Sequence, residues 1–127
     1  MDNAHFDQYI ALYIKTGKEY IDSMIEAIDV LLKNPVDKKQ MEHLYIGAHN
    51  IKSQSLVMGF ENLGNLSHEI EKIVKKHVED SSPLSQNQLN VLRKIIDKIE
   101  SVISNAEFES KNGDFSDELK TLETINN

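Results

Sequence analysis

Three side chains in the stretch AHNIKSQSLVMGF could carry out chemistry together: His49, Lys52 and Ser53. Their spacings of three and four residues place them on one face of a helix, where such residues are neighbours. An imidazole can act as a nucleophile and an ammonium group can hold an anion. Because serine is small, it leaves the imidazole open to an approaching molecule. This face is therefore a candidate reaction centre.

A second pair of polar side chains, His68 and Glu71, also lies three residues apart. Gly59 is ten residues after His49 and twelve before Glu71, so a helical hairpin turning at Gly59 would place Glu71 opposite His49. A carboxylate that accepts Nδ1–H fixes one imidazole tautomer and leaves the Nε2 lone pair free to attack. Lys52 would then supply positive charge where a transferred phosphoryl group would sit.

The elements that must position these groups are helices. The chain has 127 residues with only two prolines and five glycines, which favours long uninterrupted helices. Apolar residues recur at helical spacing in four segments, at about 3–33, 37–59, 61–78 and 85–105. Short connections between long amphipathic helices are typical of an all-α, antiparallel up-down four-helix bundle.

The sequence also predicts where the helices begin and end. Asn34-Pro35 ends the first helix, because the residue before a proline is disfavoured in the α region. Two pairs resemble capping boxes that start the second and fourth helices, namely Asp37 with Gln40 and Ser85 with Gln88. Gly59 is expected to end the second helix, and residues 79–83 are expected to form a loop.

Two further expectations concern the first helix and the C-terminal tail. Tyr9 and Leu32 are expected to broaden the apolar stripe of the first helix. After Asn105 the pattern weakens, and we divide the chain into a bundle at 1–106 and a C-terminal tail at 107–127. The spacing of Phe115, Leu119, Leu122 and Ile125 predicts a short fifth helix in this tail, the alternative being the start of a linker.

Composition and charge exclude several classes of protein. The absence of cysteine excludes disulfides and thiolate catalysis, and the net charge of −7 disfavours binding to nucleic acid. The N-terminus does not resemble a signal peptide, and no apolar run has the length of a membrane span. We expect a cytoplasmic monomer that binds neither nucleic acid nor membrane.

These residues resemble the signature of histidine phosphotransfer (HPt) domains. That signature has the pattern Ala-His-x-x-Lys-Gly, then Gly-Phe, then Leu-x-x-Leu-x-His-x-x-Glu. The corresponding stretches of this chain are AHNIKS, GF and LGNLSHEIE. The closest resemblance is to the N-terminal phosphotransfer domain of chemotaxis-type (CheA-like) histidine kinases, and it covers about residues 5–105.

The resemblance implies a role for each matching residue. His49 would be the phosphoacceptor, Lys52 the cation beside the phosphoryl group, and Glu71 the hydrogen-bond partner of His49, with His68 in the same network. Such a domain also docks partner proteins beside its phosphoacceptor.

Ser53 and Gln54 would belong to this docking surface. The family usually has glycine at the position of Ser53, and a serine there would either narrow the docking surface or bond back to the carbonyl four residues earlier.

The sequence therefore predicts a phosphorelay carrier in two-component signal transduction. It would take a phosphoryl group from a histidine kinase catalytic domain or a hybrid kinase receiver, and pass it to an aspartate of a response-regulator receiver domain. The chain has no phosphate-binding loop, so ATP and Mg²⁺ are expected on the partners, with no cofactor in this chain. It would not be catalytic alone, although it could be the substrate domain of a kinase.

Two alternatives come from other classes of protein. The same face could serve a docking module that signals without phosphorylation. A metal-dependent hydrolase would need a metal site built from His49, His68 and Glu71, which the nearby ammonium group of Lys52 disfavours. The sequence fits both a free-standing protein and the N-terminal part of a larger kinase.

Overall fold

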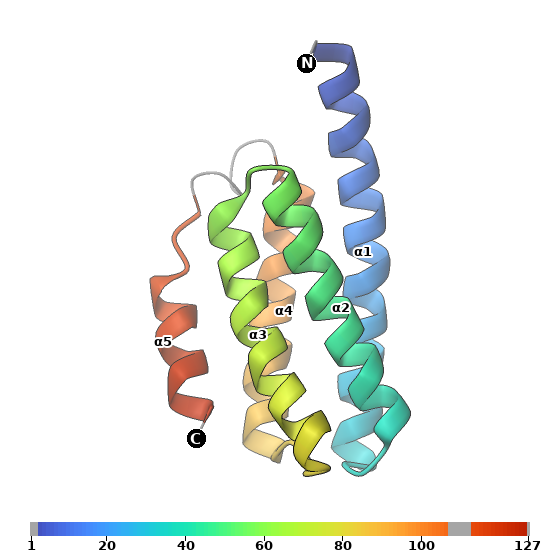
Figure 1. Cartoon of the computed structure of the whole chain (residues 1–127), viewed down its shortest axis with the longest axis vertical. Helices are drawn as coiled ribbons and strands as arrows, with labels where there is room; N and C mark the ends of the chain where they lie inside the picture. The colour runs from blue at the N-terminus through green and yellow to red at the C-terminus, as the bar shows by residue number, and fades with distance from the viewer. Residues whose placement is uncertain (1–2, 107–112, 127) are drawn as a thin grey trace.

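Five helices make up the part of the chain that the computed structural model describes, residues 3–106 and 113–126. They are α1 (Asn3–Lys33), α2 (Lys38–Val57), α3 (Glu61–Asp80), α4 (Gln86–Ser104) and α5 (Ser116–Ile125). Helices α1 to α4 run up and down beside one another, and the N-terminal turns of α1 project beyond the bundle (Figure 1). The predicted all-α bundle is confirmed, as is the fifth helix.

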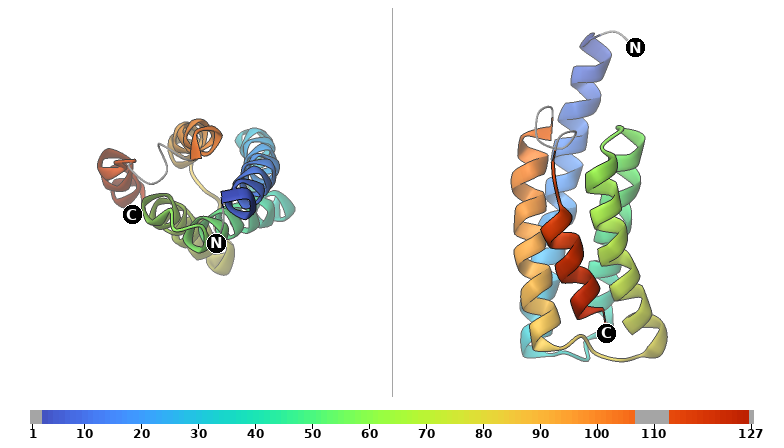
Figure 2. Two further views of the ribbon diagram at one scale, coloured as in Figure 1. Left: turned by 90° about the horizontal axis from the view of Figure 1, so that it is seen from above. Right: turned by 90° about the vertical axis from the view of Figure 1, so that its left-hand side faces the viewer.

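The first four helices pack in the spatial order α4, α1, α2, α3, and α5 lies beside both α3 and α4. Helix α1 contacts α2 and α4, and α2 contacts α3. Helix α5 lies outside these four and packs against both α3 and α4 (Figure 2). Lys98 of α4 fixes the start of α5, since its Nζ lies 5.4 Å from the centre of the Phe115 ring and 2.6 Å from a carboxylate oxygen of Glu118. Residues 107–112 of the predicted tail lie outside the described residues.

All five helices contribute to one apolar core. Its largest fully buried side chains include Phe60, Ile21, Met24, Ile28, Leu31, Leu44, Ile51, Leu63, Leu66, Ile70, Ile73 and Leu89. Phe115, Leu122 and Ile125 extend this core to α5. None of the helices in the described part of the chain combines the length and the apolar character needed to cross a membrane.

The predicted N-terminal caps are present, one of them only in part. Ser85 and Gln88 form a complete capping box, in which Gln88 N donates to Ser85 Oγ and Ser85 N donates to Gln88 Oε1. At α2, Asp37 accepts a hydrogen bond from Gln40 N at 3.1 Å. The reciprocal bond from the Gln40 side chain is not formed within the described residues.

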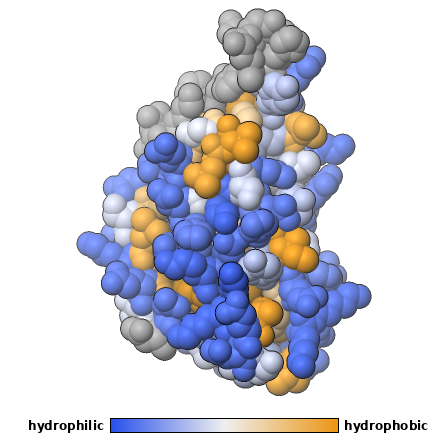
Figure 3. Space-filling model, viewed as in Figure 1, coloured by the Kyte–Doolittle hydropathy of each residue, from blue (hydrophilic) through white to orange (hydrophobic). Residues whose placement is uncertain are grey.

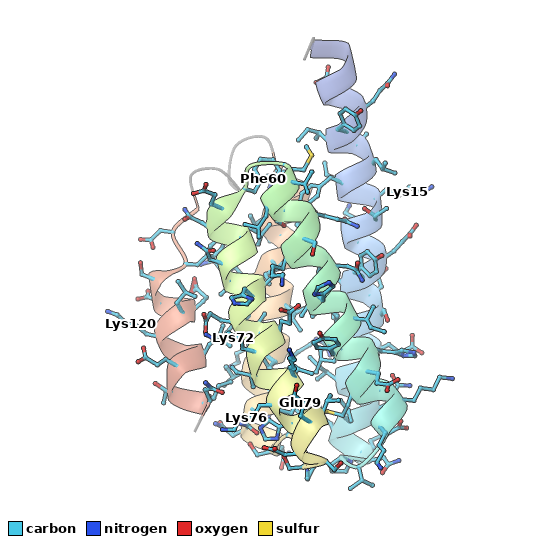
Figure 4. All side chains as sticks on the ribbon, viewed as in Figure 1. Lys15, Phe60, Lys72, Lys76, Glu79 and Lys120 are labelled. Atoms are coloured by element: carbon cyan, nitrogen blue, oxygen red, sulfur yellow. The ribbon has the colours of Figure 1, made fainter. Side chains whose placement is uncertain are left out.

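The turn between α2 and α3 sets the register of the two helices that carry the candidate site. Phe60 N donates to Ser55 O and Gly59 N donates to Leu56 O, which is the hydrogen-bond pair of a Schellman motif. Gly59 has φ of 81°, a left-handed conformation that glycine adopts without a steric penalty. Phe60 is fully buried and anchors this end of the hairpin (Figure 4).

Two details of the expected helices are wrong. Glu79 and Asp80 belong to α3 and not to the following loop, because the helix continues to a second Schellman motif in which Ser82 N donates to His77 O. Tyr9 and Leu32 do not lie on the buried stripe, since their exposed fractions are 51% and 37%. Tyr9 lies in the first turns of α1, and Leu32 is turned by about 100° from the buried Leu31.

Candidate functional site

The predicted contact between His49 and Glu71 is present where α2 and α3 lie side by side. Nδ1 of His49 lies 2.5 Å from Oε2 of Glu71. The Glu71 side chain is 8% exposed, whereas that of His49 is 47% exposed. The imidazole is therefore held from the interior by a buried carboxylate and presents its other edge to solvent.

Glu71 also binds two further cationic or polar groups of the predicted network. Lys52 Nζ donates to Glu71 Oε1 at 2.9 Å, and His68 Nδ1 lies 3.4 Å from the same oxygen. Structure and sequence thus agree on the membership of this cluster: His49, Lys52, His68 and Glu71. The ammonium group of Lys52 does not project freely into solvent, because it donates one hydrogen bond to Glu71.

The charge of Glu71 determines the tautomer of His49. Burial raises the pKa of this carboxyl, but hydrogen bonds from Lys52 and His49 and their positive charge outweigh burial and hold the pKa below its ordinary value. A carboxylate can only accept hydrogen bonds, so Nδ1 of His49 must be the donor. Neutral His49 then carries its lone pair on Nε2, which has no hydrogen-bond partner within the described residues.

The Tyr45 ring stacks beside the imidazole, a contact that sequence reasoning missed. The ring centroids of Tyr45 and His49 are 6.1 Å apart and the ring planes differ by 24°. The sequence analysis assigned Tyr45 no role at this site. The available signal was its position, four residues before His49 on the same helical face.

Ser53 and Gln54 line a groove between α1 and α2, which we call the α1–α2 groove. Its cavity volume is about 310 Å³. Helix α1 contributes Tyr9, Leu12, Tyr13 and Thr16, and α2 contributes Ser53, Gln54, Val57 and Met58. The α1 residues of this groove were not identified as site residues from the sequence, because pairing of α1 with this end of α2 is a tertiary contact.

Polar contacts hold the two walls of the groove together. Thr16 Oγ1 donates to Gln54 Oε1 at 2.9 Å, and the hydroxyls of Tyr13 and Ser55 lie 2.7 Å apart. Burial raises the pKa of Tyr13 to about 12, so this hydroxyl remains neutral. The Ser53 hydroxyl makes no bond to the carbonyl of His49 in the part of the chain described, which leaves narrowing of the surface as its expected effect.

The metal-site alternative has no matching geometry in the described ranges. No group of three or more histidine, aspartate and glutamate side chains there is placed to hold a metal ion. The ammonium group of Lys52 lies on one Glu71 oxygen and the imidazole of His49 lies on the other.

A helical bundle that displays an exposed imidazole backed by a buried carboxylate fits the class of histidine phosphotransfer proteins, and comparison with known families gives the same class. The family model described as Hpt domain matches residues 8–102, and the chain belongs to this family. It thus has a histidine phosphotransfer role in two-component signalling.

Curated relatives are long proteins that share a short region with this chain. Chemotaxis protein CheA of Bacillus subtilis is 25% identical over 97 residues, covering 76% of this chain and 14% of that protein. Chemotaxis protein CheA of Halobacterium salinarum is 24% identical over 97 residues, which again cover 76% of this chain and 14% of that protein. Chemotaxis protein CheA of Listeria monocytogenes is 19% identical over 115 residues, covering 90% of this chain and 19% of the relative.

The chain thus spans less than a fifth of the length of these relatives. No solved structure matches it.

Proposed function

We propose that this chain is a phosphorelay carrier whose phosphoacceptor is Nε2 of His49. The observation that carries the proposal is the contact between His49 Nδ1 and the buried Glu71 carboxylate, which leaves the Nε2 lone pair on the exposed side of the ring. The donor is ATP held with Mg²⁺ on a histidine kinase catalytic domain, or a phosphoaspartate of a hybrid kinase receiver. The acceptor is an aspartate of a response-regulator receiver domain.

The transfer takes two displacements at phosphorus. With ATP as donor, the Nε2 lone pair attacks the γ-phosphorus, the bond to the bridging oxygen breaks, and ADP leaves with that electron pair. The ring keeps its Nδ1 proton, shared with Glu71, and becomes a phosphoimidazolium. A carboxylate oxygen of the receiver aspartate then attacks the same phosphorus, and the electron pair of the N–P bond returns to Nε2.

The charged neighbours of His49 have complementary roles. Glu71 orients the ring and balances its positive charge after phosphorylation. An ammonium group has three N–H donors, and Lys52 uses one of them on Glu71, so two are available to a phosphoryl oxygen. His68 lies beside the same carboxylate, with its Nδ1 3.4 Å from Glu71 Oε1.

The docking surface that we propose combines the His49 face with the adjoining α1–α2 groove. Ser53 lies one helical turn beyond His49 and Val57 two turns beyond, so the groove continues from the phosphoacceptor along α2. Tyr9, Leu12 and Val57 are exposed and line this groove together, and a contiguous exposed apolar patch is typical of an interaction surface. Because the relatives are chemotaxis proteins, a chemotaxis-type kinase and its receiver domains are the partners to test first. Such a relay would operate in the cytoplasm.

Chemical phosphorylation tests the phosphoacceptor without knowledge of the kinase. Phosphoramidate, a small phosphoryl donor, should add one acid-labile phosphoryl group, observed by mass spectrometry and ³¹P NMR. The His49→Gln variant should remain unlabelled. The His77→Gln variant, which alters a histidine in the last turn of α3, should be labelled as the wild type is. Mixing the phosphorylated protein with a receiver domain should then move the label to the receiver.

Two results would contradict the carrier function. Equal labelling of His49→Gln and the wild type would place the phosphoryl group elsewhere. A wild type that takes no label, but binds a receiver domain as well as His49→Gln does, would make the chain a docking module that signals without phosphorylation.

A further inference from the structure

We propose that Tyr45 is a positioning residue for phosphoryl transfer, which acts on the imidazole of His49 through its aromatic face. This inference rests on the proposed phosphoacceptor role of His49. Tyr45 and His49 lie four residues apart on α2, and their rings are nearly parallel at a centroid distance of 6.1 Å. This separation falls within the range of offset-stacked aromatic pairs.

Two contacts of different kinds would then define the orientation of the His49 ring. The Glu71 carboxylate fixes the Nδ1 edge at 2.5 Å, but a single hydrogen bond still lets the ring pivot about its axis. The neighbouring Tyr45 ring restricts that pivot, because the two ring planes lie within 24° of each other at a centroid distance of 6.1 Å. Together the two contacts keep Nε2 aimed in one direction, which is what an in-line attack on phosphorus requires.

The same stacking stabilises the phosphorylated ring electrostatically. When Nε2 bonds to phosphorus while Nδ1 keeps its proton, the imidazole becomes a cation. The negative face of an aromatic ring attracts a cation within about 6 Å of its centroid. Tyr45 therefore interacts more strongly with the phosphoimidazolium, and with the transition state that leads to it, than with the neutral ring.

The surroundings of Tyr45 separate this role from ordinary packing. Tyr45 and Tyr20 are both half-buried and both pack against the apolar core. Tyr20 lies on α1 and has no aromatic contact with a histidine in the described ranges, so it provides a matched control. The Tyr45 hydroxyl has no protein hydrogen-bond partner there either, which assigns the function to the ring and not to the hydroxyl.

The experiment compares Tyr45→Leu, Tyr45→Phe and Tyr20→Leu by two measurements. The first is the NMR chemical shift of the imidazole protons of His49, which a stacked ring displaces; the His49→Gln spectrum identifies these signals. The second is the rate constant of His49 phosphorylation by phosphoramidate. Circular dichroism checks that each variant is folded. If Tyr45→Leu does not fold, Tyr45→Met keeps an apolar side chain of similar reach without an aromatic face.

We expect Tyr45→Leu to move the His49 signals toward those of His68, whose side chain is similarly exposed at 48%. Its phosphorylation rate should fall about two- to fivefold, the effect of losing one cation–π contact at an exposed site. Tyr45→Phe and Tyr20→Leu should match the wild type in both measurements.

Three outcomes would overturn the proposal about Tyr45. They are unchanged His49 signals in Tyr45→Leu, an unchanged rate in that variant, or a rate in Tyr45→Phe as low as in Tyr45→Leu. A wild type that takes no phosphoryl group on His49 would instead refute the proposed function, and with it the electrostatic role of Tyr45. In that case the NMR comparison would still decide whether Tyr45 orients the ring.

Discussion

His49 and His77 are both held at Nδ1 by another side chain, yet only one of them has a free reactive nitrogen. His49 Nδ1 contacts a carboxylate oxygen, and its Nε2 has no partner in the described part of the chain. His77 Nδ1 lies 3.0 Å from the Ser82 hydroxyl, and its Nε2 lies 3.5 Å from the Gln88 amide nitrogen. The neighbouring groups thus distinguish the two imidazoles, and only His49 has the unpartnered nitrogen that the proposed phosphoacceptor role requires.

The surroundings of His77 form a second polar cluster, which we call the base cluster: His77, Ser82, Gln88 and the carbonyl of Ile125. Gln88 is buried, and its Nε2 donates to Ile125 O at 2.8 Å while its Oε1 caps α4. Lys76, on the same stretch of α3, reaches the neighbouring carbonyl of Asn126 (Figure 4). The base cluster thus joins α3, α4 and the end of α5.

The two clusters also differ in what covers them. The face toward the viewer in Figure 3 is mainly hydrophilic, with small separate apolar patches, one of them near the upper end of α2 and α3. The His49 cluster opens onto a surface with exposed apolar side chains, including Leu56 and Val57. The base cluster is closed by the C-terminal residues of the chain's own α5. The proposed docking site is thus left open, whereas the base cluster is covered by α5.

The largest effect is expected for Glu71→Gln, which gives His49 a neutral hydrogen-bond partner like those of His77. In Glu71→Gln the amide can still accept from Nδ1, but the bond is no longer charge-assisted. A hydrogen bond to a charged group contributes about 1–2 kcal/mol more than a neutral one, so phosphorylation by phosphoramidate should slow about tenfold. Glu69→Gln, on the exposed side of the same helix, is the matched control and should react at the wild-type rate. A Glu71→Gln variant within twofold of the wild type would remove the carboxylate from the mechanism.

The second test breaks the base cluster. Gln88→Leu removes the partners of Ser85 N and Ile125 O, and should lower the free energy of unfolding by about 1–3 kcal/mol. Urea unfolding measures this loss, and amide exchange should show that α5 opens more readily. Gln86→Leu, an exposed change in the same helical turn, should have little effect on stability. Phosphorylation of His49 should be unchanged in both variants; slower labelling in Gln88→Leu would mean that the two clusters are coupled.

Much of this fold could be predicted from the sequence because its signals are local. The helices follow from apolar periodicity, and the capping box at Ser85 and Gln88 follows from two residue types at one spacing. The boundary after α3 was missed, because Ser81 takes a left-handed conformation with φ of 52°. Serine at such a position gives no signal comparable to that of Gly59, so the composition of the loop suggested an earlier end.

The contact at the candidate site was also predictable, since counting residues from Gly59 aligns His49 with Glu71. The side-chain geometry around that contact was not. Lys52 was expected beside the phosphoryl group, and its bond to Glu71 depends on the separation of the two helices. The stacking of Tyr45 depends on rotamers, for which sequence spacing is only a necessary condition. The roles of these residues stay predictions until the variants are measured.

The smallest effect that we predict is on the pH dependence of the unfolding free energy, which should distinguish the His49 cluster from the base cluster. Because the pKa of Glu71 is held below its ordinary value of about 4.5, its ionised form stabilises the folded state. This contribution is fully present above pH 4.5 and is lost as the pH falls through the lower folded-state pKa. Wild-type unfolding free energies, measured by urea titration at decreasing pH, should therefore decline more steeply in this range than those of Glu71→Gln.

The difference between the two proteins isolates Glu71 from other acidic groups. The pKa of Asp114 is also lowered, by hydrogen bonds from Ser116, but Asp114 is present in both proteins and cancels in the comparison. Gln88→Leu should keep the wild-type slope, since the base cluster contains no carboxylate. Parallel curves for the wild type and Glu71→Gln would mean that Lys52 and His49 do not stabilise the ionised carboxylate, and the contrast between the two histidines would lose its electrostatic basis.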